Sequence, residues 1–290
     1  MADTWLSIAS ETLTAAVNPL GAELSSLCDA QGRQLMTDAD PAYWTGRAPL
    51  LFPIIGELVG GRYRLKGQEH ALPRHGFARR MPFAPVEHGT DRLVLRLTDT
   101  AETRALYPFA FTLDVEFVLA NATLTMSATA TNHSDHDMPA SFGFHPAFAW
   151  PLPYGAPRET HRIRFEQDEP EALKQLVDNL IAVEDRPTPV DGRTLALADT
   201  LFEKDALIWE GLASERLTYG PAEGPCLEIA WGDMPNLGLW TKPGAPYLCI
   251  EPWAGIADRA GFQGEIWQKP GIWRIAPGQS DRWWMSVTLT

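Results

Sequence analysis

Residues 111–131 read FTLDVEFVLANATLTMSATAT, and this stretch decides the fold class. In its first half every second residue is apolar, namely Phe111, Leu113, Val115, Phe117 and Leu119. After Asn121 the alternation resumes with Leu124, Met126, Ala128 and Ala130. A period of two places neighbouring side chains on opposite faces of a β-strand, so one set is expected to be buried. The stretch therefore predicts two strands joined by a hairpin turn at the Ala-Asn-Ala step.

The same alternation recurs more briefly at residues 92–98 (RLVLRLT) and 286–290 (SVTLT). The 24 prolines and 23 glycines are spread along the chain, which is typical of many short strands joined by turns. One short helix is expected at residues 171–181, where apolar residues follow Pro170 at helical spacing, namely Leu173, Leu176, Val177 and Leu180. We therefore expect an all-β fold, a large antiparallel β-sandwich with few short helices.

Length and composition favour one globular domain. The chain has 290 residues, of which 45% are hydrophobic and 21% are charged, and β-sandwiches of this size commonly form one domain. A chain this long can bury a large core without support from disulfides or metals. No internal repeat, low-complexity tract or linker divides the sequence, so we expect a single domain over residues 1–290.

Charge and cysteine content exclude several classes of function. A formal net charge of -13 repels phosphate backbones and anionic lipids, so neither nucleic acid nor a membrane is an expected partner. Cys28, Cys226 and Cys249 show no paired spacing, which argues against a zinc knuckle or a redox motif. The opening MADTWLSIAS lacks the regions of a signal peptide, and no apolar run approaches the ~20 residues of a membrane span. We expect a cytoplasmic monomer or homodimer with no cofactor and no metal site.

Two of the seven histidines stand in unusual surroundings. His75 lies in LPRHGFAR at residues 72–79, and His145 lies in SFGFHPAF at residues 141–148. Each adjoins glycine or proline and has aromatic neighbours, which indicates an imidazole in a partly desolvated pocket that titrates near neutrality. A hydrogen-bonded core histidine is the alternative interpretation for each. The others stand in polar, turn-like sequence and are expected at the surface: His70, His88, His133, His136 and His161.

Two acidic residues are further candidates. Glu251 follows the apolar run YLCI and precedes Pro-Trp, so its carboxylate is expected to be buried and to need a partner or a function. Asp205, in LFEKDAL at residues 201–207, carries a weaker signal, and a solvated turn residue is its alternative interpretation. The two carboxylates could in principle form a glycosidase pair, but the unusual histidines would then have no role. No nucleotide-binding, hydrolase or zinc-protease motif is present.

Around these residues the sequence resembles the aldose 1-epimerase (galactose mutarotase) family, and most of all a bacterial branch grouped with lactose-operon products. The resemblance covers nearly the whole chain and is specific because six segments occur in the family's order. These segments are NPLGAELS at 18–25, APLLFPIIG at 48–56, LPRHGFAR at 72–79, GFHPAF at 143–148, the Asp205 segment, and PNLGLW at 235–240 through CIEPWAGIAD at 249–258.

The resemblance implies an isomerase that interconverts the α and β anomers of a hexose, on a large antiparallel sandwich with a sugar cleft on one face. It further implies that Glu251 is the general base, that His145 is the general acid, and that His75 binds and polarises the sugar. Asp205 would bind sugar hydroxyls. Opening a cyclic hemiacetal requires one base and one acid but no metal or nucleotide, and a carboxylate and an imidazole suit these roles.

Eleven tryptophans are a high number for this length, and most are expected to fill the core. A few could instead offer flat apolar platforms to the C–H faces of a sugar. By the resemblance, Trp240 lies in the cleft wall, and we include Trp253 among the expected substrate-binding residues.

One departure from the family pattern leaves the substrate open. Well-known members carry an Asn-Arg pair whose arginine binds the sugar, whereas residues 51–55 here read LFPII, so Arg47 or Arg79 would have to substitute. The sequence around His75 also resembles a hexose-6-phosphate branch, in which arginines hold the phosphate; Arg74 and Arg80 are then further candidates. The expected partner is a small sugar, either a hexose or a hexose phosphate. A non-catalytic carbohydrate-binding or sensing protein and a glycosidase or lyase auxiliary domain are the alternatives.

Overall fold

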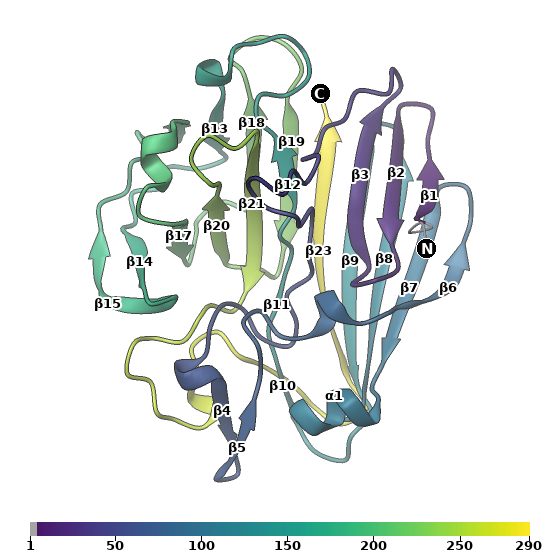
Figure 1. Cartoon of the computed structure of the whole chain (residues 1–290), viewed down its shortest axis with the longest axis vertical. Coiled ribbons are helices and arrows are strands. Elements are labelled where there is room, and N and C mark those ends of the chain that lie inside the picture. Colours follow the sequence, from purple (N-terminus) through teal and green to yellow (C-terminus); the bar gives the residue numbers. More distant parts are fainter. Residues whose placement is uncertain (1–4) are drawn as a thin grey trace.

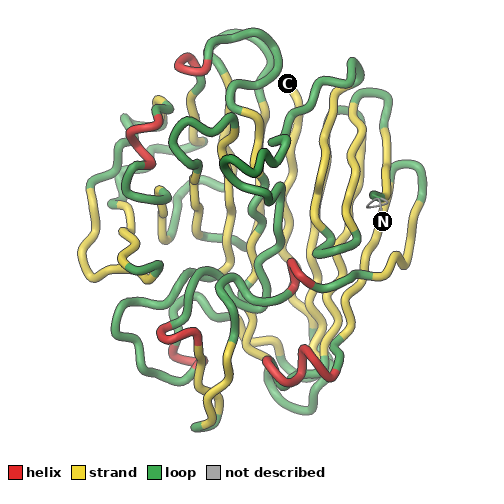
Figure 2. Tube along the Cα trace, in the orientation of Figure 1, coloured by secondary structure: helices red, strands yellow, loops and turns green. Residues whose placement is uncertain are grey.

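Figure 1 shows the computed structural model of the chain, which describes residues 5–290. The first four residues belong to the opening segment that lacks the regions of a signal peptide, and they lie outside the described residues. Strands dominate the chain (Figure 2). All their pairings within the named sheets are antiparallel. The all-β antiparallel architecture predicted from the alternating sequence is confirmed.

The largest sheet has nine strands in the order β16-β13-β18-β19-β23-β9-β8-β7-β6. Their bounds are β6 Ala84–His88, β7 Arg92–Thr98, β8 Phe111–Ala120, β9 Thr123–Asn132, β13 Arg162–Phe165, β16 Thr194–Ala196, β18 Arg216–Gly220, β19 Leu227–Gly232 and β23 Ser280–Leu289. The strands predicted in residues 111–131 are β8 and β9, which pair from Phe111↔Asn132 to Ala120↔Thr123. The odd-numbered side chains of β8 are buried, as the alternation predicts.

Two smaller sheets lie side by side over one face of the nine-stranded sheet (Figure 1). One contains β1 Leu6–Ala9, β2 Leu13–Asn18 and β3 Glu23–Asp29, and it contacts β7, β8 and β9. The other has seven strands in the order β11-β21-β20-β17-β14-β15, with β12 also paired to β21. Their bounds are β11 Phe142–Gly143, β12 Ala147–Ala149, β14 Leu173–Val177, β15 Leu180–Arg186, β17 Leu207–Glu210, β20 Asn236–Trp240 and β21 Tyr247–Ala254.

Aromatic side chains join the seven-stranded sheet to the nine-stranded sheet. Phe142 of β11 stacks on Trp283 of β23 with ring centroids 5.3 Å apart, and Phe165 of β13 meets Trp209 of β17 at 5.6 Å. The shorter elements close the ends of the sandwich. They are β4 Arg62–Leu65, β5 Gln68–Ala71, β10 Met138–Ala140, β22 Trp273–Ile275, the helix α1 Ala101–Leu106, and the 3-10 turns η1 Val59–Gly61, η2 Ala78–Arg80, η3 Arg158–Thr160, η4 Asp199–Phe202 and η5 Ile266–Gln268.

The helix predicted at residues 171–181 is wrong, because this segment is the hairpin β14–β15. Asp178 and Asn179 form its two-residue turn with φ of 51° and 64°. Positive φ at both central positions is the type I′ geometry that suits the twist of two strands, and Asp and Asn tolerate it. Leu176 therefore pairs across the hairpin with Ile181, and its apolar spacing does not mark a helical face.

The expectation that His161 is a surface residue is also wrong. Its side chain is buried, and its Nε2 accepts a hydrogen bond of 3.0 Å from the backbone N–H of Leu152. The ring therefore serves as a satisfied core group beside Tyr219, whose ring centroid lies 5.9 Å away. Among residues 5–290, no helix is both long enough and apolar enough to cross a bilayer.

Candidate active site

A cavity of about 350 Å³ lies on the seven-stranded sheet, on the face turned away from the main core. Alternation along β21 explains this position. Leu248 and Ile250 pack into the main core, whereas Glu251 and Trp253 line the cavity from the other face. The full lining is Trp44, Ile55, Gly56, Arg74, His75, Arg79, His145, Leu176, Asn179, Ile181, Asp205, Ala206, Ile208, Trp240, Glu251, Trp253, Ile256 and Ala257.

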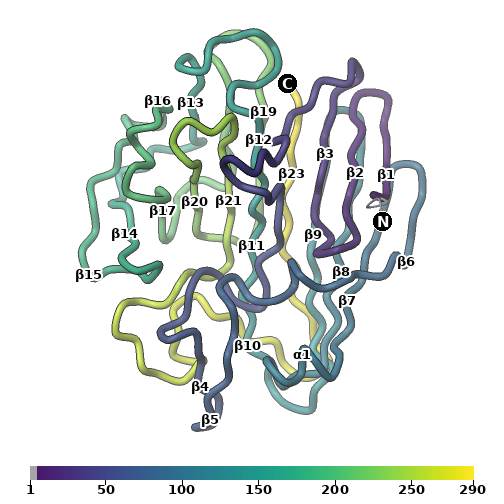
Figure 3. The backbone as a smooth tube through the Cα atoms, in the orientation of Figure 1, coloured from purple at the N-terminus to yellow at the C-terminus, as the bar shows by residue number. Residues whose placement is uncertain are grey.

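His145 reaches the cavity from the link between β11 and β12, which Figure 3 shows running beside β21. The two ends of this link pair with β21 through Gly143↔Trp253 and Ala147↔Cys249. Backbone hydrogen bonds of 3.1 and 3.2 Å continue the same register inside the link. His145 therefore lies directly across from Glu251, at the short separation typical of cross-strand neighbours.

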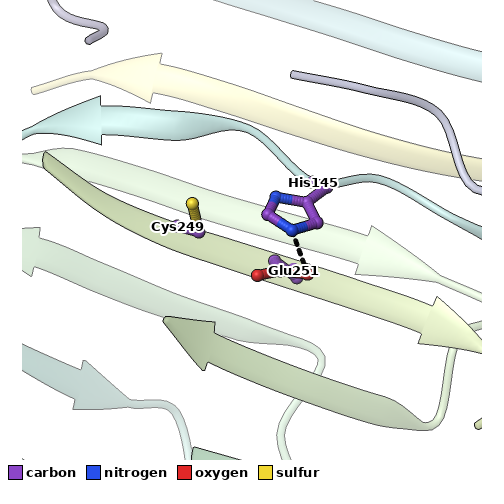
Figure 4. Close-up of side chains that lie close together, drawn as sticks. All are labelled: His145, Cys249 and Glu251. Atoms are coloured by element: carbon purple, nitrogen blue, oxygen red, sulfur yellow. Dashed lines mark ion pairs between the residues drawn. The ribbon is translucent and has the colours of Figure 1, made fainter. Parts of the chain in front are cut away.

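The side chains of this pair are in contact. Nε2 of His145 lies 3.2 Å from Oε2 of Glu251 (Figure 4), and the residues are 9% and 2% exposed. Burial raises the pKa of Glu251 well above its ordinary 4.5, although the charge of Arg74 acts in the opposite direction. Burial lowers the pKa of His145 from 6.5 to about 3. Nδ1 of His145 is buried without a hydrogen-bond partner among residues 5–290.

Both ring nitrogens of His75 face N–H donors. Nδ1 lies 3.1 Å from the backbone N–H of Gly56, and Nε2 lies 3.2 Å from the Nε–H of Arg74. A neutral imidazole has one acceptor nitrogen, so it accepts one of these two hydrogen bonds at a time. Burial lowers the pKa of His75 well below 6.5, and the charges of His145 and Arg74 add to this effect. The ring centroids of His75 and His145 lie 6.1 Å apart. The two unusual histidines of the sequence therefore face one cavity.

A tight turn at residues 75–76 positions His75. The φ angles of His75 and Gly76 are 63° and 69°. A Cβ on Gly76 would lie 2.1 Å from the carbonyl oxygen of Phe52, so no other residue fits there without displacing the backbone. The turn thereby lies close to the segment that ends at Gly56, whose carbonyl accepts a hydrogen bond of 2.8 Å from the N–H of His75.

Two arginines line the cavity without a carboxylate partner among the described residues. Arg74 donates through Nη1 to Oδ1 of Asn179 at 2.8 Å, and its Nε lies 3.2 Å from Nε2 of His75. Arg79 donates through Nη2 to the carbonyl of Arg74 at 2.9 Å. The Nε of Arg79 is buried, and residues 5–290 offer it no acceptor. The cavity lining thus carries two guanidinium groups beside the carboxyl groups of Asp205 and Glu251.

Trp253 packs against two glycines. A Cβ added to Gly143 or to Gly238 would lie 2.6 Å from its ring, so both positions must lack a side chain. The indole N–H of Trp253 is buried and acts on the carboxylate of Glu251, whose pKa it lowers against the effect of burial. The ring forms part of the cavity lining.

Two further tryptophans form an aromatic wall. Trp44 lies 5.0 Å from the ring of His145 and meets Trp240 edge-on at 5.5 Å, measured between ring centroids. Trp240 is the cross-strand partner of Cys249 and covers the strand beside Glu251. The expected place of Trp240 in the cavity is matched by the structure, while Trp44 is an addition to the expected residues.

The remaining predicted residues separate into two groups. Asp205 lines the cavity with φ of 74°, and its Oδ1 accepts a hydrogen bond of 2.8 Å from Ala206 N–H. Arg47 lies outside the cavity lining, because its guanidinium group donates to the carbonyls of Thr37 and Asp38 at 2.7 and 2.6 Å. Arg47 therefore does not reach the cavity, whereas Arg79 lines it.

Sequence reasoning missed the contribution of the β14–β15 hairpin. Leu176, Asn179 and Ile181 line the cavity, and the helix assigned to this segment concealed the Asp178-Asn179 turn signal that would have placed them. Trp44 had no signal that separates it from the other tryptophans. It lies in residues 41–47, a turn-rich stretch of the sequence.

One group of metal-ligating atoms lies beside the cavity. A ring nitrogen of His145, Sγ of Cys249 and a carboxylate oxygen of Glu251 lie within 4.8 Å of one another, and all three residues are buried (Figure 4). Cys28, Cys226 and Cys249 all have free thiols. The spacing of the cysteines in the sequence did not indicate a group of His145, Cys249 and Glu251. These three residues come together only because β21 pairs with the link that carries His145.

Comparison with known proteins identifies the family. The sequence pattern of aldose 1-epimerases matches residues 5–287. The chain belongs to the aldose 1-epimerase family. Members of this family are isomerases that act on sugars, so this protein is a sugar epimerase with a small-molecule sugar as its substrate. Protein LacX, in its plasmid form from Lactococcus lactis subsp. lactis, is 29% identical over 295 residues that cover 98% of this chain and 99% of LacX.

Solved structures of family members share the whole fold. A galactose mutarotase related enzyme from Lactobacillus acidophilus matches with a TM-score of 0.91 at 30% identity, covering 99% of this chain and 97% of that one. A galactose mutarotase-like protein from Lactobacillus casei ATCC 334 also has a TM-score of 0.91, at 26% identity, covering 99% of this chain and 100% of that one. The mutarotase-like sandwich expected from the sequence is thus confirmed.

Proposed function

We propose that this aldose epimerase interconverts the α and β anomers of a free hexose, with Glu251 and His145 as the groups that move protons. The observation that carries the proposal is the 3.2 Å contact between a buried carboxylate and a buried imidazole at one cavity of about 350 Å³. A lone buried carboxylate and a lone buried imidazolium are both unfavourable. The pair therefore holds one proton in total. Burial raises the pKa of Glu251, which opposes loss of that proton, and lowers the pKa of His145, which opposes gain of a second one.

Burial favours the form of the pair in which Glu251 holds the shared proton and His145 is neutral. The reactive form in this proposal is the other tautomer, in which that proton has moved across the contact to His145 and Glu251 is ionised. The carboxylate takes the proton of the C1 hydroxyl while Nε2 of His145 gives its proton to the ring oxygen, and the bond between C1 and the ring oxygen breaks. The product is an open-chain aldehyde beside a carboxylic acid and a neutral imidazole, so the net charge of the pair is unchanged. Rotation about C1–C2 and the reverse transfers close the ring as the other anomer.

The contact distance suits this chemistry. The hydroxyl oxygen and the ring oxygen are bonded to the same carbon, so a base and an acid that touch each other can reach both oxygens at once. Ring opening and ring closure each move one proton onto the pair and one proton off it. The net charge of the pair therefore stays at zero throughout the reaction. Acid–base catalysis of this kind typically contributes 10²–10⁴-fold per group.

Other cavity groups bind the sugar in this proposal. Nε–H of Arg79, which lacks a partner among the described residues, donates to a sugar oxygen, while His75 and the ring of Trp253 contact the sugar beside it. The carboxylate of Asp205 accepts from a sugar hydroxyl. The flat face of Trp240 packs against the C–H face of the ring.

Polarimetry tests the proposal. Fresh α-D-glucose and α-D-galactose should relax to the equilibrium rotation faster with the protein than without it. Calorimetry measures binding of the same two sugars. If the protein binds either sugar but leaves the rate of relaxation unchanged, it is a carbohydrate-binding protein without turnover, which is the alternative that the sequence leaves open.

A second candidate substrate is a hexose phosphate. Arg74 and Arg79 favour it, because both guanidinium groups line the cavity without a carboxylate partner in the described chain and Arg79 retains an unused donor. Arginine holds phosphate through charge-assisted, often bidentate hydrogen bonds. Anomer exchange of glucose 6-phosphate should then be favoured over that of glucose at low salt, and the preference should shrink at high salt. Equal rates for both sugars at low salt would exclude this candidate.

A further inference from the structure

We propose that His145, Cys249 and Glu251 bind a thiophilic divalent cation such as Zn²⁺, and that the bound cation blocks the sugar reaction. The binding rests on the geometry of the three side chains. The block rests in addition on the proposed function, which gives His145 and Glu251 their role in proton transfer.

The sheet places the three ligands on one face. Cys249 and Glu251 are two residues apart on β21, so both side chains point to the same side of the strand. His145 is the cross-strand neighbour of Glu251 and lies diagonally across from Cys249. The three residues therefore form a compact triangle held by backbone pairing, and β-sheet register fixes its shape.

The distances suit a tetrahedral zinc site. Zinc bond lengths to sulfur and nitrogen place neighbouring ligand atoms of a tetrahedron roughly 3.3–3.6 Å apart. Nε2 of His145 and Oε2 of Glu251 are already 3.2 Å apart. A ring nitrogen of His145, Sγ of Cys249 and a carboxylate oxygen of Glu251 lie within 4.8 Å of one another. A rotation of the Cys249 side chain toward the pair closes the remaining gap.

The ligand chemistry selects the class of cation. A thiolate, an imidazole and a carboxylate are the ligands of Zn²⁺, whereas Mg²⁺ and Ca²⁺ prefer sites made of oxygen alone. One thiolate and one carboxylate balance the two positive charges of the cation, so the filled site is neutral in its buried surroundings. Binding releases two protons to solvent, one from the Cys249 thiol and one from the His145–Glu251 pair.

The route of entry explains the block. His145 and Glu251 line the cavity, whereas Cys249 is fully buried behind Trp240. The cation therefore enters through the sugar cavity and keeps its fourth coordination position toward it. Coordination occupies the lone pair of the imidazole nitrogen, and the charge of the cation makes the Glu251 carboxylate a much weaker base, so sugar turnover stops while the cation is bound.

Cobalt titration of the full chain tests the binding without reference to activity. Co²⁺ should bind with a stoichiometry of one and give a thiolate-to-cobalt charge-transfer band in the near ultraviolet. Cys249→Ser should lose the band and weaken Zn²⁺ binding by more than about tenfold in calorimetry, since even changes behind metal ligands cost that much. The matched control is Cys28→Ser/Cys226→Ser, which removes the two other thiols and should keep the band.

Circular dichroism and a thermal melt establish that Cys249→Ser is folded, and Cys249→Ala serves as a second variant for the same test. A band that persists in both folded variants, or no band in the wild type, would overturn the site. Zn²⁺ should inhibit anomer exchange by the wild type but not by Cys249→Ser, which should keep basal activity. Binding without inhibition would overturn the block. If the wild type has no activity, the cobalt result still decides the site, and the proposed function alone has failed.

Discussion

His145 and Glu251 are cross-strand neighbours, and their side chains meet at 3.2 Å although the residues are far apart in the chain. Continuous pairing on both sides of the link that carries His145 fixes this relationship. A site built on sheet register is held more rigidly than a site built on loops, which favours the tight geometry that proton transfer requires. His75, by contrast, depends on a turn and on the amide of Gly56.

The absence of a side chain at Gly238 should be essential for the shape of the cavity, because the Trp253 ring packs against this position. In Gly238→Ala the new Cβ would lie 2.6 Å from the Trp253 ring, so the ring must move into the space proposed for the sugar. We expect kcat/KM for anomer exchange to fall by about tenfold or more, because misplacements of about 1 Å near reacting groups can cost up to 10²-fold. Gly89→Ala is the control, since its Cβ would have only an ordinary 3.6 Å contact. Unchanged kinetics in Gly238→Ala would contradict this role of Trp253.

Stability in acid should depend on His145. Its pKa is lowered from 6.5 to about 3, so between these values the unfolded chain binds a proton that the folded chain does not. The free energy of unfolding is therefore unaffected by this group above pH 6.5. It decreases as the pH falls from 6.5 toward 3, by up to about 1.4 kcal/mol per pH unit. His145→Gln should flatten this fall.

Urea unfolding at several values between pH 7 and pH 4 measures the effect. The exposed His133 provides the matched variant, and His133→Gln should keep the wild-type slope. If the free energy of unfolding depends on pH in the same way in His145→Gln and in the wild type, burial does not lower the pKa of His145 in the folded chain.

The buried ion pair between Asp258 and Lys269 should stabilise the fold around Val59, three residues after Gly56. Asp258 accepts hydrogen bonds from Nζ of Lys269 at 2.7 Å and from the N–H of Val59 at 3.0 Å, and the Lys269 side chain is fully buried. Asp258→Ala leaves the lysine charge buried and unpaired, and we expect a loss of about 3–5 kcal/mol in the free energy of unfolding. The double variant Asp258→Ala/Lys269→Met should recover part of this loss, because it buries no charge.

Chemical denaturation of the wild type, the single variant and the double variant measures this coupling. A single variant within about 0.5 kcal/mol of the wild type, the range of ordinary surface substitutions, would refute the structural role of the pair.

The strands could be predicted where one face is buried and the other is partly exposed. In β8, side chains such as Phe117 alternate with Glu116 and Val118, and this period of two appears directly in the sequence. The β14–β15 hairpin could not be assigned in this way, because Leu173, Leu176 and Leu180 have a spacing that also fits a helix. Only the positive φ at Asp178 and Asn179 decides between the two structures.

The candidate site was predictable in its residues but not in its geometry. Local sequence singled out His75, His145 and Glu251, yet their meeting depends on pairings between distant segments that no local pattern encodes. Arg47 shows the same limit: its sequence allowed a place in the cavity, but backbone carbonyls at residues 37 and 38 hold its guanidinium group elsewhere. His161 was misjudged because polar neighbours in the sequence do not exclude burial in space.

The most direct test of the central claim is the rate of anomer exchange in Glu251→Gln, measured by polarimetry against the wild type and against Glu169→Gln. Glu169 is a matched control, since it is equally buried but accepts hydrogen bonds from the N–H groups of Ala213 and Ser214, and it does not line the cavity. The account predicts that Glu251→Gln loses the acceleration by at least about 100-fold while it still binds sugar, and that Glu169→Gln keeps it. A wild-type rate in folded Glu251→Gln would contradict the account.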